Sequence, residues 1–417
     1  MEVVIVGLGY VGLSLAIEFG KKNSTIGVDV DPGRISQLEK KIDKNREISE
    51  HEFKEASKLI FNSVIPTNVN IIPRFYIITV PTHIHSDKTP DFSILYQATK
   101  GVGEKLRKND IVIFESTVYP GCTEEECVPI LEKASGLKFN SDFFCGYSPE
   151  RINPGDRNNR LPNILKITSG STPEIAQKID NLYKTIIHAG TYVAPNIKIA
   201  EAAKLIENCQ RDVNISFMNE LALIFDKMDL DTHEVLKAAG TKWNFLKFQP
   251  GLVGGNCISV DPYFMLHKAT QMGYFPALIG SGRKINDTMG SFVANKVIKL
   301  MTKKNINIIG ARALILGITF KENCPDIRNT KVVDIYSELR EFGMEVDIYD
   351  PWADKDEVKD SFEIELIPEL KKQYDVLIYA VNHQIFYGKN LHEILRANHV
   401  LYDVKGTLNK DLVDGRL

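Results

Sequence analysis

The sequence is poor in several features that mark broad classes of protein. Its 417 residues carry 51 Lys and Arg against 54 Asp and Glu, for a net charge of −3, and the basic residues form no cluster. This composition excludes the electrostatic signature of a nucleic-acid-binding protein. No apolar run approaches the ~18 residues that cross a bilayer, and no basic segment with a long apolar stretch opens the chain. We therefore expect no nucleic-acid partner, no membrane anchor and no secretory signal.

Cysteine is scarce as well, and its spacing is uninformative for metals. The six cysteines include no Cys-x-x-Cys pair, and no other clustering suggests a metal site. Most of them are expected to be reduced, buried thiols, which favours a cytoplasmic location and no bound metal. They are Cys122, Cys127, Cys145, Cys209, Cys257 and Cys324.

Alternating apolar and amphipathic segments occupy both ends of the chain. Near the start, helix-length amphipathic stretches separate the strand-like runs VVIVG, STIGVDV, FYIITV and DIVIFES. The same pattern returns after residue 305 in RALILGI, EVDIYDP, DVLIYAV and HVLYDV. Such alternation predicts a parallel sheet with crossover helices at each end.

The middle of the chain has a different pattern. Residues 196–228 contain neither Gly nor Pro, and their apolar residues recur at helical spacing, which predicts one long helix. We therefore predict an α/β protein in which two Rossmann-like doubly wound domains are joined by a long central helix. The predicted domains are 1–195, 196–304 and 305–417.

A glycine motif opens the first helical segment. Gly7, Gly9 and Gly12 form GxGxxG directly after a strand-like run, the context in which this pattern cradles a dinucleotide pyrophosphate at a helix N-terminus. Asp29 closes the next strand-like run, about 20 residues on, where a carboxylate accepts from ribose hydroxyls and repels a 2′-phosphate. Together these elements predict NAD as the cofactor. Arg34 is either a ligand of the phosphate or ribose, or a solvated side chain.

A second glycine-rich stretch, PGLVGGNCISVDPY, surrounds one cysteine. Cys257 is a metal ligand, a packed core residue or a nucleophile, and the lack of a second Cys or His at ligand spacing disfavours a metal. The glycines and Asp261 favour close approach of a ligand over core packing. Beside a nicotinamide site, a nucleophilic thiol suits the oxidation of an alcohol to an acid, because a thiohemiacetal holds the aldehyde between two hydride transfers.

Candidates for the remaining chemistry lie elsewhere in the chain. Lys204 and Asn208 are one turn apart on the long helix, where they can stabilise alkoxide charge and position a water or hydroxyl. Thr117 and Glu150 follow strand-like runs, and ligands of α/β sheets bind at the carboxyl ends of strands. Glu150 is a candidate general base for thioester hydrolysis. The alternatives are a solvated helix face for Lys204 and a surface carboxylate for Glu150.

Six motifs together resemble one family. GLGYVGL, ESTVYPG, SPERINPGD, EAAKLIENCQRDVN, GLVGGNCISVDPY and ITFKENCPDIRNTK occur in the order found in nucleotide-sugar 6-dehydrogenases, the UDP-glucose/GDP-mannose dehydrogenase family. SPERINPGD is similar to the UDP-N-acetylhexosamine branch of Vi-antigen and O-antigen pathways. The resemblance implies NAD-dependent four-electron oxidation of C6 of UDP-GlcNAc or UDP-GalNAc to the uronic acid, for surface polysaccharide synthesis. UDP-glucose and UDP-ManNAc are the alternative substrates.

The resemblance also implies catalytic roles at matched positions. Cys257 resembles the family's nucleophile, and Lys204 and Asp261 resemble its proton-handling and oxyanion-stabilising residues. Asn208, Thr117 and Glu150 resemble the residues that order water and serve the thioester step. The long helix resembles the family's dimer core, which implies a homodimer.

Binding roles follow from the same resemblance. Lys321 and Arg328 resemble the C-terminal residues that hold the nucleotide-sugar, with a point charge and a bidentate fork for phosphate. The segment WNFLKFQPG resembles the loop that covers the uridine diphosphate. Further NAD contacts are expected from Tyr10, Val11, Pro81, Thr82, Ser116 and Thr117. Substrate contacts are expected from Glu150, Arg151, Lys204, Asn208, Phe245, Gly251, Gly254, Gly255, Lys321 and Arg328.

Three positions depart from the family pattern. Asn256 replaces the usual His beside the nucleophile, Ser259 replaces Pro or Gly, and Gln249 stands where close relatives often have a basic residue.

Three rival functions stay open. A short-chain epimerase or reductase would use YxxxK, which occurs at Tyr96 and Lys100, but this rival leaves the second α/β domain unexplained. A β-hydroxyacid dehydrogenase would use a helix lysine and asparagine without a nucleophilic cysteine. The third rival is a non-catalytic nucleotide-sugar binder.

Overall fold

The computed structural model describes residues 2–45, 47–67, 73–152, 159–370 and 373–417. The chain forms two compact units: unit 1 is Met1–Glu207 with Tyr263–Tyr274, and unit 2 is Asn208–Pro262 with Phe275–Leu417. The three predicted domain boundaries stay a prediction. Residues 153–156 of the SPERINPGD motif lie outside the described residues.

Unit 1 is built on a six-stranded sheet in which every neighbouring pair is parallel. β1, β4 and β7 are buried along their whole length, because a parallel sheet carries helices on both faces. This burial explains the continuous apolar runs in the sequence. In spatial order the strands are β3 (Leu59–Asn62), β2 (Ser24–Val28), β1 (Glu2–Val6), β4 (Arg74–Ile78), β7 (Ile111–Phe114) and β8 (Phe144–Tyr147).

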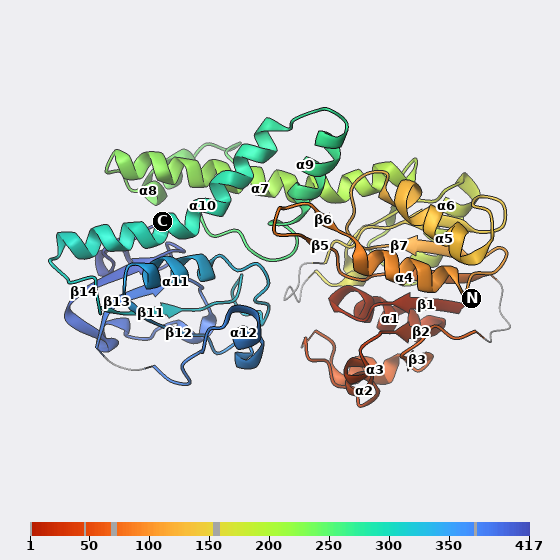
Figure 1. Ribbon diagram of the computed structural model, residues 1–417, viewed down its shortest axis with the longest axis horizontal. Coiled ribbons are helices and arrows are strands. Elements are labelled where there is room, and N and C mark those ends of the chain that lie inside the picture. Colours follow the sequence, from red (N-terminus) through yellow and green to blue (C-terminus); the bar gives the residue numbers. More distant parts are fainter. Residues whose placement is uncertain (1, 46, 68–72, 153–158, 371–372) are drawn as a thin grey trace. The chain divides into compact units, whose positions relative to one another are not determined.

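The strand order of this sheet reverses between β1 and β4, as in a doubly wound fold. α1 and α6 pack on one face through Leu13, Ile17, Ile179 and Leu182. α4 packs on β4 and against α5 (Figure 1). The helices are α1 (Tyr10–Lys22), α2 (Pro32–Glu39), α3 (Glu50–Glu55), α4 (Ser93–Gly103), the π-helical turn η1 (Thr123–Cys127), α5 (Val128–Ser135) and α6 (Pro173–Lys184).

Short elements complete unit 1. β9 begins with Lys166 and pairs in parallel with β10. These elements are β5 (His83–Ile84), β6 (Pro90–Asp91), η2 (Leu161–Asn163), β9 (Lys166–Thr168) and β10 (Thr191–Val193).

Unit 2 contains a second parallel sheet, with α10 and α11 packed on one face through Val293, Val297, Ile335 and Leu339. In spatial order its strands are β12 (Glu345–Tyr349), β11 (Arg312–Leu316), β13 (Tyr374–Tyr379), β14 (Leu395–Asp403) and β15 (Gly415–Arg416). The helical elements are α8 (Thr232–Ala239), α10 (Ala277–Lys303), α11 (Val332–Glu341), α12 (Lys355–Phe362), η3 (Gln384–Phe386), η4 (Leu391–Ile394) and η5 (Lys410–Leu412).

Two helices run from one unit into the other. α7 (Ile197–Lys227) is the long helix predicted from the sequence, and α9 (Asp261–Gln271) follows the Cys257 stretch (Figure 1). The predicted fold class, two Rossmann-like domains joined by a long helix, is confirmed. Among the described residues, no helix combines the length and apolar character needed to span a membrane.

Candidate active site

The glycine motif forms a tight turn between β1 and α1. A Cβ on Gly12 would lie 1.8 Å from the Gly7 carbonyl oxygen and 2.4 Å from Thr79 Oγ1, so only glycine fits there. A Cβ on Gly9, by contrast, would have no heavy atom of the described residues within 4 Å beyond its own chain neighbours and the backbone of its helix. The turn is therefore closed toward the sheet and open at the N-terminus of α1, where a phosphate can approach the backbone N–H groups.

Asp29 lies directly after β2 and braces the same turn. Its Oδ2 accepts from the Leu8 N–H at 2.8 Å, and its Oδ1 accepts from the Asp31 N–H at 3.0 Å. The carboxylate is half-buried. Asp29 thus has a structural role in addition to the predicted contact with the cofactor ribose.

Arg34 is a second brace, and the alternative of a solvated arginine is wrong. Only 4% of the residue is exposed. Its Nε donates to the Leu8 carbonyl oxygen at 3.0 Å, and its Nη2 pairs with Asp43 Oδ1 at 2.9 Å. Contact between Arg34 and the cofactor stays a prediction.

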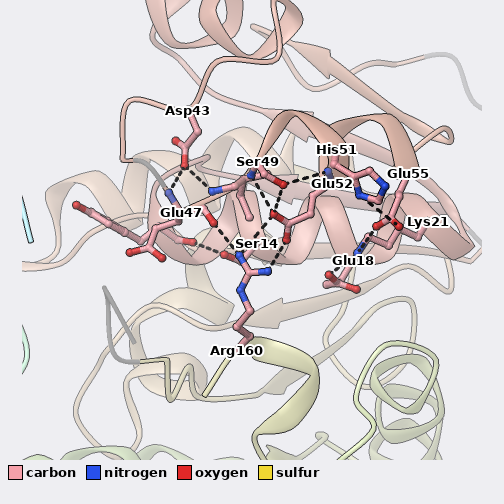
Figure 2. A network of polar contacts seen from close by, with 12 residues as sticks. Ser14, Glu18, Lys21, Asp43, Glu47, Ser49, His51, Glu52, Glu55 and Arg160 are labelled. Carbon is pink, nitrogen blue, oxygen red and sulfur yellow. Dashed lines mark hydrogen bonds and ion pairs between the residues drawn. The ribbon is translucent and has the colours of Figure 1, made fainter. Parts of the chain in front are cut away.

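Asp43 also organises the segment that leads into α3 (Figure 2). Its carboxylate accepts from the N–H groups of Asn45, Glu47 and Ile48 at 3.0–3.2 Å. Arg160 reaches this segment from elsewhere in unit 1, pairing with Glu52 at 2.8 Å and donating to the Glu47 carbonyl oxygen at 2.9 Å. A polar network therefore holds the surroundings of the Leu8 turn in one arrangement.

Removal of the Asp29 charge tests the predicted cofactor choice. Asp29→Asn keeps an acceptor for the Leu8 N–H but loses the charge that repels a 2′-phosphate, so we expect weaker use of NAD and a narrower preference over NADP. Asp29→Ala also loses the brace and should in addition lower the thermal midpoint of unfolding. Steady-state kinetics with both cofactors measure the ratio; equal wild-type efficiency with NAD and NADP would contradict the prediction.

Two hydroxyls tie together the loops that follow β4 and β7. Ser116 Oγ donates to the Val80 carbonyl oxygen at 2.6 Å, and Thr82 Oγ1 donates to the Thr117 carbonyl oxygen at 2.9 Å. Ser116 and Thr82 are buried, whereas Thr117 is half-buried and Pro81 is exposed. These loops follow the carboxyl ends of strands, as does the glycine turn with Tyr10 and Val11 on the first turn of α1. The predicted NAD contacts thus share one edge of the sheet.

Glu150 follows β8 at the same edge, and the alternative of a surface carboxylate is wrong. It is 6% exposed. Its Oε2 contacts Lys166 Nζ at 3.1 Å, and its Oε1 accepts from the N–H groups of Arg151 and Ile152, both at 2.6 Å. Lys166 also pairs with Glu115 at 2.7 Å, and Glu115 accepts from the Tyr183 hydroxyl. Sequence reasoning missed Lys166, Glu115 and Tyr183.

Two charged side chains on the unit 1 part of α7 are buried. Lys204 is 8% exposed, so the alternative of a solvated helix face is wrong. Glu201, one turn earlier, accepts from the N–H groups of Gly121 and Thr123 at 2.6 and 2.9 Å. Burial raises the pKa of Glu201 to about 7. Arg151, which is predicted to contact the substrate, pairs with Glu207 of α7 at 2.9 Å. Its guanidinium is therefore held by a carboxylate of the protein itself.

In unit 2, the Cys257 stretch forms a turn that leads into α9. The Cys257 carbonyl oxygen accepts from the Asp261 N–H at 3.0 Å, and Asp261 accepts from Asn208 Nδ2 at 2.5 Å. Asp261 and Asn208 are buried, but Cys257 is exposed. The alternative of a packed core cysteine is therefore wrong, and the structure brings two predicted catalytic residues, Asn208 and Asp261, into direct contact.

The glycines before Cys257 make room for another part of unit 2. A Cβ on Gly255, whose φ is +79°, would lie 2.9 Å from the Phe320 ring, and one on Gly254 would lie 2.8 Å from the Asn329 carbonyl oxygen. Close packing within the protein therefore requires these glycines, a reason that the sequence did not reveal. Their contact with the substrate stays a prediction.

Two of the positions that depart from the family pattern take part in this turn. Asn256 Oδ1 accepts from Asn329 Nδ2 at 3.0 Å, and Ser259 Oγ donates to the Gly255 carbonyl oxygen. Hydrogen bonds of both side chains thus hold the turn beside Cys257. Gln249 is exposed.

The predicted nucleotide-sugar residues of unit 2 lie around the same turn. Lys321 lines a small cavity together with Gly254, Lys331 and Lys405. The Lys331 ammonium pairs with Asp287 at 3.3 Å and with Asp334 at 3.1 Å. Arg328 makes a two-pronged pair with Asp326, with Nε at 2.9 Å from Oδ1.

Gly251 and Phe245 belong to the segment predicted to cover the uridine diphosphate. The Gly251 N–H donates to Asn219 Oδ1 at 2.8 Å, and Asn219 Nδ2 donates to the Gly251 carbonyl oxygen at 3.0 Å. Phe245 is half-buried. One side chain of α7 therefore satisfies both backbone groups of Gly251 and fixes this end of the segment.

Comparison with known proteins identifies the family of this chain. Models of the UDP-glucose/GDP-mannose dehydrogenase family match as its NAD binding domain over residues 1–187, its central domain over 198–288 and its UDP binding domain over 314–410. The UDP-N-acetyl-D-glucosamine 6-dehydrogenases of Pseudomonas aeruginosa and Salmonella typhi are each 53% identical, over 100% of this chain and 99% of theirs. A solved structure of a UDP-D-ManNAc dehydrogenase from Pyrococcus horikoshii has a TM-score of 0.88 at 27% identity, covering 100% of this chain and 98% of that one. The chain belongs to the UDP-glucose/GDP-mannose dehydrogenase family and is an NAD-dependent oxidoreductase, as predicted.

Proposed function

We propose that this protein oxidises the C6 hydroxyl of UDP-GlcNAc to the carboxylate and consumes two NAD per sugar. The observation that supports this substrate most strongly is the 53% identity, along the full chain, to two UDP-N-acetyl-D-glucosamine 6-dehydrogenases. Identity to the UDP-N-acetyl-D-mannosamine dehydrogenases is lower, at 30% for the Pyrococcus horikoshii enzyme. UDP-GalNAc, UDP-ManNAc and UDP-glucose are the competing substrates.

The residues of unit 1 fit NAD. The turn is open at Gly9, the fully described first turn of α1 carries no acidic residue, and Asp29 follows β2. Gly7, Gly9 and the N-terminus of α1 would hold the pyrophosphate, and Asp29 the ribose. When bound, NAD supplies the acceptor for the hydride that leaves C6 in each oxidation.

Cys257 supplies the covalent chemistry in this proposal. Its thiolate adds to the C6 aldehyde, and the new S–C bond gives a thiohemiacetal after the carbonyl oxygen takes a proton. Oxidation then gives a thioester, which water attacks at C6 as the C–S bond breaks and the thiolate leaves. The exposed position of Cys257 supports this role because a nucleophile must reach its substrate.

The other side chains handle charge and protons. Lys204 would stabilise the negative oxygen at C6, and Asn208, held by Asp261, would orient a water or hydroxyl. Glu150 would take the proton of the hydrolytic water. The diphosphate would bind to the predicted pair of unit 2, Lys321 and Arg328, with a point charge and a bidentate fork.

We further propose a homodimer that forms through α7 and acts in the cytoplasm in the synthesis of a surface polysaccharide. The dimer is supported by two apolar side chains two helical turns apart on the unit 2 part of α7, Phe217 and Ile224, which are 52% and 45% exposed. The location is supported by the free thiols of all six cysteines.

A product screen tests the proposed function. With UDP-GlcNAc the wild-type protein should release two NADH for each sugar consumed, and mass spectrometry should detect the uronic acid, because C6 passes from alcohol to acid. UDP-GalNAc, UDP-ManNAc, UDP-glucose and GDP-mannose are the matched comparisons. A clear preference for UDP-glucose, or one NADH per sugar, would contradict the proposal, and no NADH with any sugar would favour a non-catalytic binder.

A further inference from the structure

A buried charge cluster surrounds Glu150 in unit 1. Glu115 directly follows β7, Glu150 follows β8, Lys166 begins β9 and Tyr183 lies in α6. Lys166 Nζ contacts Glu115 Oε2 at 2.7 Å and Glu150 Oε2 at 3.1 Å, and it lies 5.4 Å from the centre of the Tyr183 ring. All four residues are at most 6% exposed. One ammonium is therefore shared by two carboxylates away from water.

The cluster does not balance its charges when both carboxyls are ionised. Burial of charge is costly unless it is paired, and two carboxylates with one ammonium leave a net charge of −1. Burial raises the pKa of Glu115 to about 7, against the lowering effect of Lys166. Burial disfavours the charge of Lys166, but Glu115 and Glu150 more than offset this effect and raise its pKa. Lys166 thus stays an ammonium, and Glu115 is the carboxyl whose charge burial disfavours.

Two charged side chains on the elements around this cluster, Arg151 and Asp180, have partners of their own. Arg151, next to Glu150, pairs with Glu207 of α7. Asp180 of α6 accepts from Thr168 of β9 at 3.1 Å and pairs with the exposed Lys184. Glu115 is therefore the carboxylate that competes with Glu150 for Lys166.

The hydrogen bonds that the described residues make to Glu150 do not use its full acceptor capacity. A carboxylate offers about four acceptor positions. Lys166 and the N–H groups of Arg151 and Ile152 occupy three of them. Within the part of the chain that the structure describes, the carboxylate is thus fixed in orientation and keeps one acceptor position for a further donor.

We propose that Lys166 and Glu115 are positioning residues for Glu150 in thioester hydrolysis. Lys166 fixes the Glu150 carboxylate, and Glu115 shares the same ammonium, so that Lys166 does not act on Glu150 alone when Glu150 accepts the proton of the attacking water. This inference rests on the proposed function, because it assigns residues to the hydrolytic step.

The two residues should change the pH dependence in opposite directions. The quantity compared is the midpoint pH of thioester decay, below which decay of the thioester on Cys257 is slow. In Lys166→Met, Glu150 loses its cation and takes a proton more readily, so this pH should rise. In Glu115→Gln, Lys166 acts on Glu150 alone, so this pH should fall and decay at neutral pH should slow. Opposite charges within 4–6 Å move carboxyl titrations by roughly one to three pH units. Lys166→Arg should restore most of the wild-type profile.

The measurement is single-turnover decay of the sugar thioester, quenched at a series of pH values and followed by mass spectrometry of the enzyme. Arg74→Met is the matched control. Arg74 is 1% exposed, pairs with Glu2 at 2.7 Å and begins β4, at the amino-terminal edge of the same sheet. The Arg74→Met variant also loses a buried cation, so we expect a comparable effect on folding. Its pH profile of thioester decay should stay unchanged.

Several results would overturn the inference. Shifts of Lys166→Met and Glu115→Gln in the same direction, or an equal shift in Arg74→Met, would reduce the cluster to a structural element. If Lys166→Met does not fold, Glu115→Gln decides, and an unmoved profile counts against the inference. If the wild-type protein turns over but the variants do not show these shifts, only the inference is overturned. If the wild-type protein releases no NADH, the proposed function is overturned as well.

Discussion

Replacement of Cys257 by Ala should abolish formation of the uronic acid while NAD and UDP-sugar still bind. The thiol is required only for the covalent steps, and the exposed position of Cys257 on the turn before α9 gives its side chain no core to support. We therefore expect the variant to fold normally and to lose acid production by several orders of magnitude. Mass spectrometry of products and calorimetric binding of each ligand measure the two effects separately.

Cys257→Ser should retain at most a slow reaction, because an alkoxide forms with more difficulty than a thiolate. Cys209→Ala is the matched control in unit 2. Cys209 is 6% exposed, and burial, together with the charges of Asp261 and Asp212, raises its pKa to about 12, so it is a poor nucleophile. This variant should keep acid production. Near-wild-type acid formation by Cys257→Ala would instead favour a mechanism like that of a β-hydroxyacid dehydrogenase.

The features that the sequence predicted well are those set by local pattern. GxGxxG predicted a dinucleotide site because a strand-like run precedes it and a helical segment follows it. Residues 196–228 contain neither Gly nor Pro, and the long helix α7 forms there. The exposure of Cys257 also agrees with its neighbours, because a turn rich in glycine offers little for a side chain to pack against. Local sequence therefore predicted the fold class correctly, whereas the roles of the main candidate residues stay predictions.

The features that the sequence did not reveal depend on segments that meet only in the fold. Lys166 stands in a strand of three residues, too short to show a period, and contacts Glu115 from 51 positions away. Gly255 suggested room for a ligand, but its neighbour is the Phe320 ring. For Arg34 the sequence left open a contact with phosphate or ribose and a solvated side chain, and the pairing with Asp43 excludes the second. In each case, the partner that decides the role is not adjacent in sequence.

A second buried network, in unit 2, links α7 to α10. Arg283 pairs with Asp212, whose side chain is fully buried, and with Asp287 at 2.7 Å. Asn286 Nδ2 donates to Asp212 Oδ1 at 2.7 Å, and Asn219 Nδ2 donates to Asn286 Oδ1 at 2.8 Å. Since Asn219 also holds Gly251, the network connects the helix pair to the segment predicted to cover the nucleotide.

Arg283→Met should lower the free energy of unfolding by about 3–5 kcal/mol, because it leaves the Asp212 carboxylate buried without its cation. Urea unfolding measures this loss. Lys296→Met is the matched control, since Lys296 pairs with Asp226 across the same two helices but both side chains are about a quarter exposed. An exposed pair contributes ~0–1 kcal/mol, so the control should lose little. Equal losses in the two variants would show that burial of Asp212 is not the cause.

The pH dependence of the loss separates charge from packing. Burial already raises the pKa of Asp212, and Arg283 opposes that rise. Without Arg283 the carboxyl should bind a proton in the folded state at a pH where the unfolded chain does not. The unfolded state of the variant then holds fewer protons than the folded state, so its stability falls as pH rises. The loss relative to wild type should therefore be larger at about pH 8 than at about pH 5. A loss that is the same at both pH values would assign the effect of Arg283 to packing of its side chain, because the volume of a methionine does not depend on pH.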